Sequence, residues 1–260
     1  MAQRELPVIE TAAIAWRDAF QAIDVMPVVA GIAFALYLVL SLAISALAIS
    51  AINPNPFALI GSPWLPIISI IAGIVQAALL APLAIAVHRF VLLGEKTNRY
   101  PLDPKSSRYL RFVGFSILVK ILWLIPFIED LLPAARDYGL GVVTAVLFTT
   151  LVIMLVRRAI LFPAIAIDAP GATWRKARLD TKGSSWRVAF IFVLTGLPVL
   201  IINILLGPLW FLPGQAQPNA GGFLFFSVIE APIAIAALCA YAAAASHIYR
   251  ARANSMTEPG

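Results

Sequence analysis

Charged residues are scarce in this chain of 260 residues. They make up 12% of the sequence, whereas 61% of it is hydrophobic and the mean hydropathy is +0.92. A soluble domain carries about 25% charged and about 45–50% apolar residues, so this composition leaves too little charge to cover a water-exposed surface. Intrinsic disorder is also excluded, because it needs low hydrophobicity and high net charge. The composition predicts an integral membrane protein made of helices.

Cysteine and histidine are also rare, and no catalytic motif is present. The one cysteine, Cys239, can form no disulfide within the chain. The two histidines, His88 and His247, have no cysteine or carboxylate at ligand spacing, so a zinc site is not expected. The sequence contains no Walker A, G-x-G-x-x-G, G-x-S-x-G or H-E-x-x-H pattern. We expect no metal and no cofactor, and an enzyme is disfavoured unless a cleft gathers the histidines with Asp168 and Asp180.

Long apolar runs are what the sequence has in their place. A bilayer core about 30 Å thick needs about 20 apolar residues in a helix. Six segments meet or approach this length, at 28–52, 64–87, 112–132, 139–156, 188–210 and 223–247. The sequence therefore predicts an all-α, polytopic membrane helix bundle of six transmembrane helices over residues 28–248. A cytoplasmic amphipathic segment, 1–27, is expected to precede it, and a cytoplasmic tail, 249–260, to follow it.

The positive charges predict the orientation of these spans. The loops 88–111 and 157–187 carry six and seven Lys and Arg residues, together 13 of the 19 in the chain. The alternate loops 53–63 and 211–222 carry none, and 129–138 carries one. Because cytoplasmic loops are enriched in Lys and Arg, both termini are predicted to be cytoplasmic. We expect the protein in a bacterial cytoplasmic (inner) membrane.

An amphipathic helix is predicted ahead of the first span, over Ile9–Met26. At 100° per residue, one face collects Ile9, Ala12, Ala13, Trp16, Phe20 and Ile23, and the opposite face collects Glu10, Arg17, Asp18, Gln21 and Asp24. Such a helix can lie in the membrane interface with Trp16 at the headgroups. Its net acidic charge argues against attraction to anionic lipid. The alternative is that the helix packs beneath the cytoplasmic ends of the spans.

Two ionisable side chains are predicted inside the hydrocarbon. Lys120 lies nine residues beyond Arg111, and Glu230 lies seven residues beyond Phe223, which places them about 13 Å and about 10 Å from opposite boundaries. A charge at the bilayer centre costs at least about 2.5–3.5 kcal/mol, so such residues usually face the bundle interior. We predict an intramembrane ion pair between Lys120 and Glu230. The alternative is that each side chain reaches the nearer headgroup region.

Prolines and small residues mark the predicted spans. Six prolines fall within or near the ends of spans, at Pro66, Pro82, Pro126, Pro198, Pro208 and Pro232. An interior proline frees a backbone carbonyl, which we expect polar side chains to satisfy, namely Gln76, Asn203, Ser41 and Ser45. Small residues at a spacing of four predict close helix packing: Ser69, Gly73, Ala77 and Ala81 in one span, and Ala236, Ala240 and Ala244 in another.

The second basic loop carries the strongest candidate binding site. After Arg157 and Arg158, the apolar stretch 159–167 is too short to cross a bilayer and suits the inner interface, and 173–181 has short helical character. Seven basic residues against two aspartates make its net charge +5. We predict contact with anionic lipid through Arg157, Arg158, Trp174, Arg175, Lys176, Arg178 and Lys182. The alternative is the ordinary positive excess of cytoplasmic loops, which also explains the net charge of +6 without nucleic acid.

This loop resembles a segment of a group of bacterial multi-span membrane proteins. The group tends to have an arginine, an apolar stretch with Pro-Ala, an aspartate, a tryptophan, and then Thr-Lys-Gly and Trp-Arg. Here these are Arg158, Phe162–Asp168, Trp174, Thr181–Gly183 and Trp186–Arg187. Over residues 158–187 the chain is similar to the YciC-like family and to the membrane domain of glycerophosphoryl diester phosphodiesterases. The resemblance implies a membrane domain of undefined role and carries over no catalytic residue, since the phosphodiesterase barrel has no counterpart in this chain.

Two functions follow from these features. The first is a membrane-organising or accessory protein without enzymatic activity, which contacts anionic lipid or a partner through its basic loops. The second is a small transporter or permease with a cavity near Lys120 and Glu230. Membrane lipids are the expected partners, and the sequence leaves open both a protein partner and a homo-oligomer.

Overall fold

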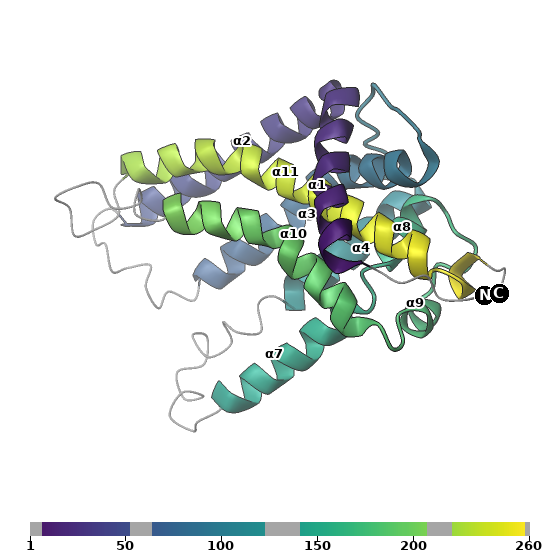
Figure 1. Ribbon diagram of the computed structural model, residues 1–260. Helices are drawn as coiled ribbons and strands as arrows, with labels where there is room; N and C mark the ends of the chain where they lie inside the picture. Colours follow the sequence, from purple (N-terminus) through teal and green to yellow (C-terminus); the bar gives the residue numbers. More distant parts are fainter. Residues whose placement is uncertain (1–6, 53–63, 123–140, 207–219, 258–260) are drawn as a thin grey trace.

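The computed structural model describes residues 7–52, 64–122, 141–206 and 220–257 (Figure 1). Its helices are α1 (Val8–Val25), α2 (Pro27–Ile52), α3 (Trp64–Leu93), α4 (Ser107–Leu122), α7 (Gly141–Val156), α8 (Leu161–Ala166), α9 (Trp174–Asp180), α10 (Ser185–Leu206), α11 (Ala220–Arg252) and the 3₁₀ turn η3 (Ser255–Thr257). Within those four ranges no residue forms a strand. The predicted all-α class is confirmed.

Four helices are long and apolar enough to cross a membrane. They are Pro27–Leu47 in α2, Ile67–Leu93 in α3, Ser185–Leu206 in α10 and Leu224–Arg252 in α11. The apolar helix Val142–Val156 in α7 is shorter. The predicted spans 112–132 and 139–156 lie partly outside the described residues. Glu129 and Asp130, near the end of the former span, lie wholly outside them. The chain is a membrane-embedded helical protein, and a count of six spans stays a prediction.

Helix α11 is the centre of the bundle. It packs against α1, α2, α3, α8 and α10, and Figure 1 shows α2 and α10 running one way along the bundle and α3 and α11 running back. Small residues allow this central position, because they let helix backbones approach closely. Ala240 and Ala244 of α11 are fully buried, and Ala77 and Ala81 of α3 are buried as well. Ser69, at the other end of the predicted stripe, is exposed.

Helix α1 crosses the bundle rather than continuing a span (Figure 1). Its buried face is made of Thr11, Ala12, Ala15, Ala19 and Ala22. The larger apolar residues Ile9 and Phe20 are 78% and 54% exposed. The Trp16 indole N–H donates to the Thr195 carbonyl of α10 at 3.0 Å, which ties the helix to the spans. The helix therefore packs on the bundle through its small residues, and part of its predicted apolar face is left uncovered.

The proline in α3 is compensated by a tyrosine of α4. Pro82 has no N–H to donate to the carbonyl four residues earlier, which belongs to Ala78. The Tyr109 hydroxyl donates to that carbonyl at 2.9 Å, and the Tyr100 hydroxyl donates to the neighbouring carbonyl of Leu79. Burial raises the pKa of Tyr109 above its usual value, so the phenol keeps its proton. Sequence reasoning named other polar residues for this role and missed the tyrosines.

Three of the four polar residues that were expected to satisfy freed carbonyls have other partners, and for Ser41 the role stays a prediction. Gln76 accepts a hydrogen bond from Lys120 at 2.9 Å. Asn203 donates to the Val199 carbonyl of its own helix at 2.9 Å. Ser45 of α2 shares a 2.8 Å hydrogen bond with Ser227 of α11, and so joins two helices.

Candidate functional site

The two basic loops meet at one end of the bundle, which we call the basic end. Arg108 of α4 forms a two-nitrogen ion pair with Asp168, at 2.8 Å for its Nε. Arg89 of α3 donates to the Ala166 carbonyl at 3.0 Å, and Arg111 donates to the Ala172 carbonyl at 2.7 Å. These three arginine contacts, the loop clamp, place residues 88–111 and 157–187 on the same side of the bundle.

The segment held by the loop clamp is buried. Helix α8 packs against α3, α4 and α11, and its residues Leu161, Pro163, Ala164, Ile165 and Ala166 are buried. The stretch 159–167, predicted to lie in the membrane interface, is thus packed within the protein, and its depth in the membrane stays a prediction. Its apolar side chains are covered by protein, because the short helix fits beneath three longer ones.

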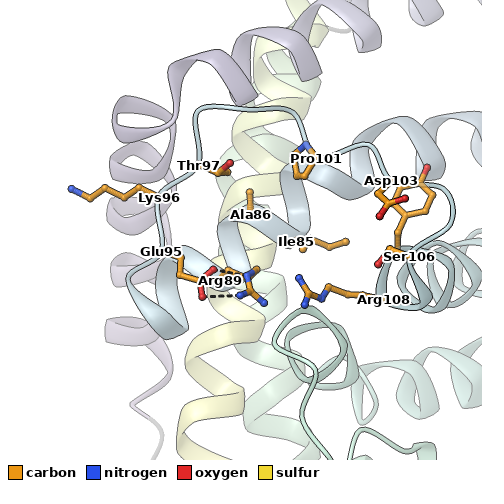
Figure 2. A pocket seen from close by; sticks show the side chains of 11 residues that line it. Ile85, Ala86, Arg89, Glu95, Lys96, Thr97, Pro101, Asp103, Ser106 and Arg108 are labelled. Atoms are coloured by element: carbon orange, nitrogen blue, oxygen red, sulfur yellow. Dashed lines mark hydrogen bonds and ion pairs between the residues drawn. The ribbon is translucent and has the colours of Figure 1, made fainter.

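A cavity of about 290 Å³ opens between the end of α3 and the start of α4. Figure 2 shows the guanidinium groups of Arg89 and Arg108 at its inner wall, with Lys96 pointing away from it. Arg89 is held by Glu95 through two contacts of 2.6 and 2.7 Å. The cations around the cavity are matched by acids, since Glu95, Asp103 and Asp168 accompany Arg89, Lys96 and Arg108. The cavity has no positive excess for an anionic ligand, and its arginines act as supports.

Arg158 lies within an aromatic cluster. Its guanidinium carbon is 4.2 Å from the ring centroid of Trp174, an arrangement that attracts a cation to the ring face. Phe115 meets the edge of Trp174 at 5.6 Å and packs on Phe162 at 4.5 Å. Arg158 is 9% exposed, and it donates to the Met154 carbonyl at 3.1 Å. Of the predicted lipid contacts, Arg158 is thus buried, while Trp174 is 38% exposed.

The remaining predicted contacts lie on or beside α9. Thr173 caps this helix by accepting from the Lys176 N–H at 3.4 Å. Arg175, Arg178 and Lys182 follow one another at spacings of three and four residues, and all three are exposed. Lys176 and Arg157 are half-buried. The structure therefore brings together the predicted cations, and it divides them into exposed and buried groups.

Exposed apolar side chains follow these cations along the chain, and sequence reasoning did not single them out. Leu179 is 54% exposed, Trp186 is 72% exposed and Phe190 is 56% exposed. The cation Arg187 stands among them and is exposed too. The available signal was the alternation of aromatic and basic residues at the start of the fifth predicted span. We call the surface of Trp174, Arg175, Arg178, Leu179, Lys182, Trp186, Arg187 and Phe190 the basic aromatic surface.

The structure does not bring the predicted intramembrane ion pair together. Lys120 lies on α4 and donates to Gln76 of α3, with its aliphatic chain over Gly73. Glu230 lies on α11 and accepts from the Tyr37 hydroxyl of α2 at 3.1 Å. Each side chain thus has a partner on the helix packed beside its own. Neither Lys120 nor Glu230 lines the cavity at the basic end.

The histidines and aspartates named for a catalytic cleft are also separate. His88 shares a 2.8 Å hydrogen bond with Ser246, and His247 shares one of 2.8 Å with Asp18 of α1. Asp168 belongs to the loop clamp, and Asp180 accepts from the Met256 N–H at 3.2 Å. The described part of the chain contains no group of three His, Cys, Asp or Glu residues that could hold a metal ion.

Comparisons with family models, with curated proteins and with solved structures find no match to this chain.

Proposed function

We propose that the protein is a membrane-organising or accessory protein that contacts anionic lipid headgroups through the basic aromatic surface. The observation that carries this proposal is the exposure of Trp186, Phe190 and Leu179 beside Arg175, Arg178 and Lys182. Large exposed apolar side chains suit the acyl boundary of a bilayer, and tryptophan is enriched at its interface. Cations beside them suit the headgroup layer.

Carboxylates of the protein neutralise some of the positive charges of the two basic loops. In the first basic loop, Arg89 and Arg108 are neutralised by carboxylates in the loop clamp and its cavity. Arg175, Arg178 and Lys182 enter none of the ion pairs between described residues. Each such cation near an anionic leaflet contributes about 1 kcal/mol of attraction. The exposed Lys96, Arg99 and Lys105 of the first loop enter none of these ion pairs either. The second loop is therefore set apart by the exposed apolar residues Leu179, Trp186 and Phe190 that follow its cations along the chain.

The same proposal includes the topology. Six spans with cytoplasmic termini in a bacterial inner membrane place the basic end in the cytoplasm, where anionic lipid meets positive loops. The loop clamp supports a common side for both loops, because its contacts of 2.7–3.0 Å permit no bilayer between them. Helix α1 then lies at the inner interface with Ile9 and Phe20 toward the lipid. The resemblance to the YciC-like membrane proteins stays part of this proposal.

Quenching of tryptophan fluorescence by brominated lipids tests the lipid contact. The full chain is reconstituted in vesicles of phosphatidylcholine and phosphatidylglycerol, with the bromine on one lipid or the other. The wild type is expected to show stronger quenching by the brominated phosphatidylglycerol. The triple variant Arg175→Gln, Lys176→Gln, Arg178→Gln is expected to lose most of that preference.

A matched control separates this surface from general charge. The variant Lys96→Gln, Arg99→Gln, Lys105→Gln removes the same three charges from exposed positions of the first basic loop. It is expected to keep the preference for phosphatidylglycerol. The proposal is contradicted if the wild type and the α9 triple variant show equal preferences for phosphatidylglycerol. If both triple variants lose the preference equally, net charge explains the lipid contact and this surface has no special role.

A further inference from the structure

A second cavity, of about 590 Å³, lies between α7 and α10. Helix α7 stands apart from the bundle in Figure 1, and its contacts are with α10 and α4. The walls of this groove are apolar, with Val152, Ile153 and Val156 on one side and Ala189 on the other. Because both helices are apolar and one is long enough to span the bilayer, the space between them borders on lipid rather than water.

The inner end of the groove is cationic. Arg157 lines it together with Gly183, Ser185 and Trp186. From Phe148 to Val156 the wall extends along α7 for about 12 Å, and Arg157 follows directly after the helix. The groove therefore has an apolar length and one charged end, which is the shape of an amphiphile with an anionic head.

The lining arginine, Arg157, and its neighbour in the chain, Arg158, are not neutralised by the protein. The Nε atoms of Arg157 and Arg158 are buried without a hydrogen-bond partner. The pKa of Arg158 is lowered by burial and then by the like charges of Arg178 and Arg157. None of the ion pairs between described residues includes these three side chains. Buried cations are costly without a counter-charge, so this cluster differs from the cavity of the loop clamp and favours an anion.

We propose that the groove binds one anionic glycerophospholipid, with an acyl chain between α7 and α10 and its phosphodiester at Arg157. This deepens the lipid contact proposed above and rests on it, since it assigns one retained lipid to a particular site beside the basic aromatic surface. The volume falls within the range of about 300–1,000 Å³ that is usual for small-molecule sites. An arginine matches a phosphate because its fork of N–H donors can bind two oxygens at once.

Native mass spectrometry of the full chain in mild detergent tests this site. Dioleoyl phosphatidylglycerol and dioleoyl phosphatidylcholine are added in equal amounts, and the lipid retained by each chain is counted. The wild type is expected to retain one phosphatidylglycerol in preference to phosphatidylcholine. Arg157→Gln is expected to weaken that retention about tenfold, the usual effect of losing a hydrogen bond to a charged group. Arg157→Lys keeps the charge and is expected to retain part of the preference.

A second variant tests the apolar half of the site. Ala189→Phe places a ring in the groove without changing any charge, and it is expected to reduce retention of both lipids. The control Lys105→Gln removes an exposed cation that lines neither the groove nor the basic aromatic surface, and it is expected to retain lipid as the wild type does. Thermal unfolding checks each variant, because bound lipid raises the melting temperature only where the folded site exists.

Three results overturn the proposal. They are equal retention of the two lipids by the wild type, unchanged retention by both Arg157→Gln and Ala189→Phe, and an equal rise in melting temperature with inorganic phosphate alone. The last result indicates a free-anion site. Failure of the general lipid contact is distinguishable, because Arg157→Gln leaves the α9 cations in place and the α9 triple variant leaves the groove intact. If the wild type shows no quenching preference in vesicles but still retains one phosphatidylglycerol in the mass spectrometer, only the surface contact is refuted.

Discussion

The tyrosine that compensates the proline of α3 allows a quantitative test of the packing. Pro82 leaves the Ala78 carbonyl without its helical donor, and the Tyr109 hydroxyl takes that place at 2.9 Å. Tyr109 is 8% exposed, so water does not replace the hydroxyl readily when it is removed. Leaving a buried acceptor unsatisfied costs about 1–3 kcal/mol. We therefore expect Tyr109→Phe to reduce the free energy of unfolding by that amount.

The proline decides whether this cost arises. In a Pro82→Ala background, the new amide N–H can donate to the Ala78 carbonyl within the helix, so Tyr109→Phe no longer leaves it unpaired. The cost of Tyr109→Phe is then expected to fall to the lower end of the about 0.5–1.5 kcal/mol that an ordinary hydrogen bond contributes. The two substitutions are thus coupled by about 0.5–2.5 kcal/mol, within the range known for residues that share a contact.

Unfolding of the full chain by sodium dodecyl sulfate in mixed micelles, followed by circular dichroism, measures these free energies for the four proteins of the cycle. Tyr100→Phe is the matched control, because its acceptor, the Leu79 carbonyl, faces Leu83, which has an N–H. It is expected to cost less than Tyr109→Phe. An equal cost of Tyr109→Phe in the presence and absence of the proline refutes the compensation.

Two further predictions concern the basic end. A Cβ at Gly171 would lie 2.7–2.9 Å from the Met256 backbone. Gly171→Ala is therefore expected to lower the free energy of unfolding by about 1–3 kcal/mol through overpacking and to speed proteolysis of the C-terminal segment. In the control Gly73→Ala the nearest neighbour of the new Cβ is at 3.7 Å, so this variant is expected to stay resistant to proteolysis. The second prediction uses the single-cysteine variants Lys105→Cys and Lys182→Cys, each in a background without the native cysteine. Both are expected to react with an impermeant maleimide from the same side of the membrane, because the loop clamp joins their loops. Labelling of the two variants from opposite sides contradicts this topology.

Sequence reasoning located most helices but placed their ends too early or too late. The predicted spans 64–87 and 223–247 correspond to helices α3 and α11, which continue to Leu93 and Arg252. The predicted span 64–87 ends just before His88 and the predicted span 223–247 ends at His247, because basic residues follow both histidines. In the structure His88 and Ser246 share a hydrogen bond between the two helices, which allows both to continue beyond the apolar window. Packing between helices decides where such helices end, and a hydropathy average along one helix carries no information about that packing.

The sequence predicted which residues make up the candidate site, but it did not predict how they are arranged. The seven predicted lipid contacts do lie together at the basic end, but Arg158 is buried beneath Trp174 and Arg157 lines the groove beside α7. Phe190 was assigned to a span and Trp186 to the loop before it, and the structure leaves both side chains exposed. Spacing along the chain predicts which residues share a helix face. It does not predict which face another helix covers.

The order of hydrophobic and basic segments determined that this chain is a helical membrane protein with its positive charge gathered in two loops. That information is local, since the transfer of a helix from water to lipid depends on the sum of its own side chains. Tertiary structure alone decided the partners: Gln76 for Lys120, Tyr37 for Glu230 and Tyr109 for the Ala78 carbonyl. Each choice depends on the depth and rotation of two helices relative to each other, and a buried polar group takes whichever partner that geometry places within about 3 Å.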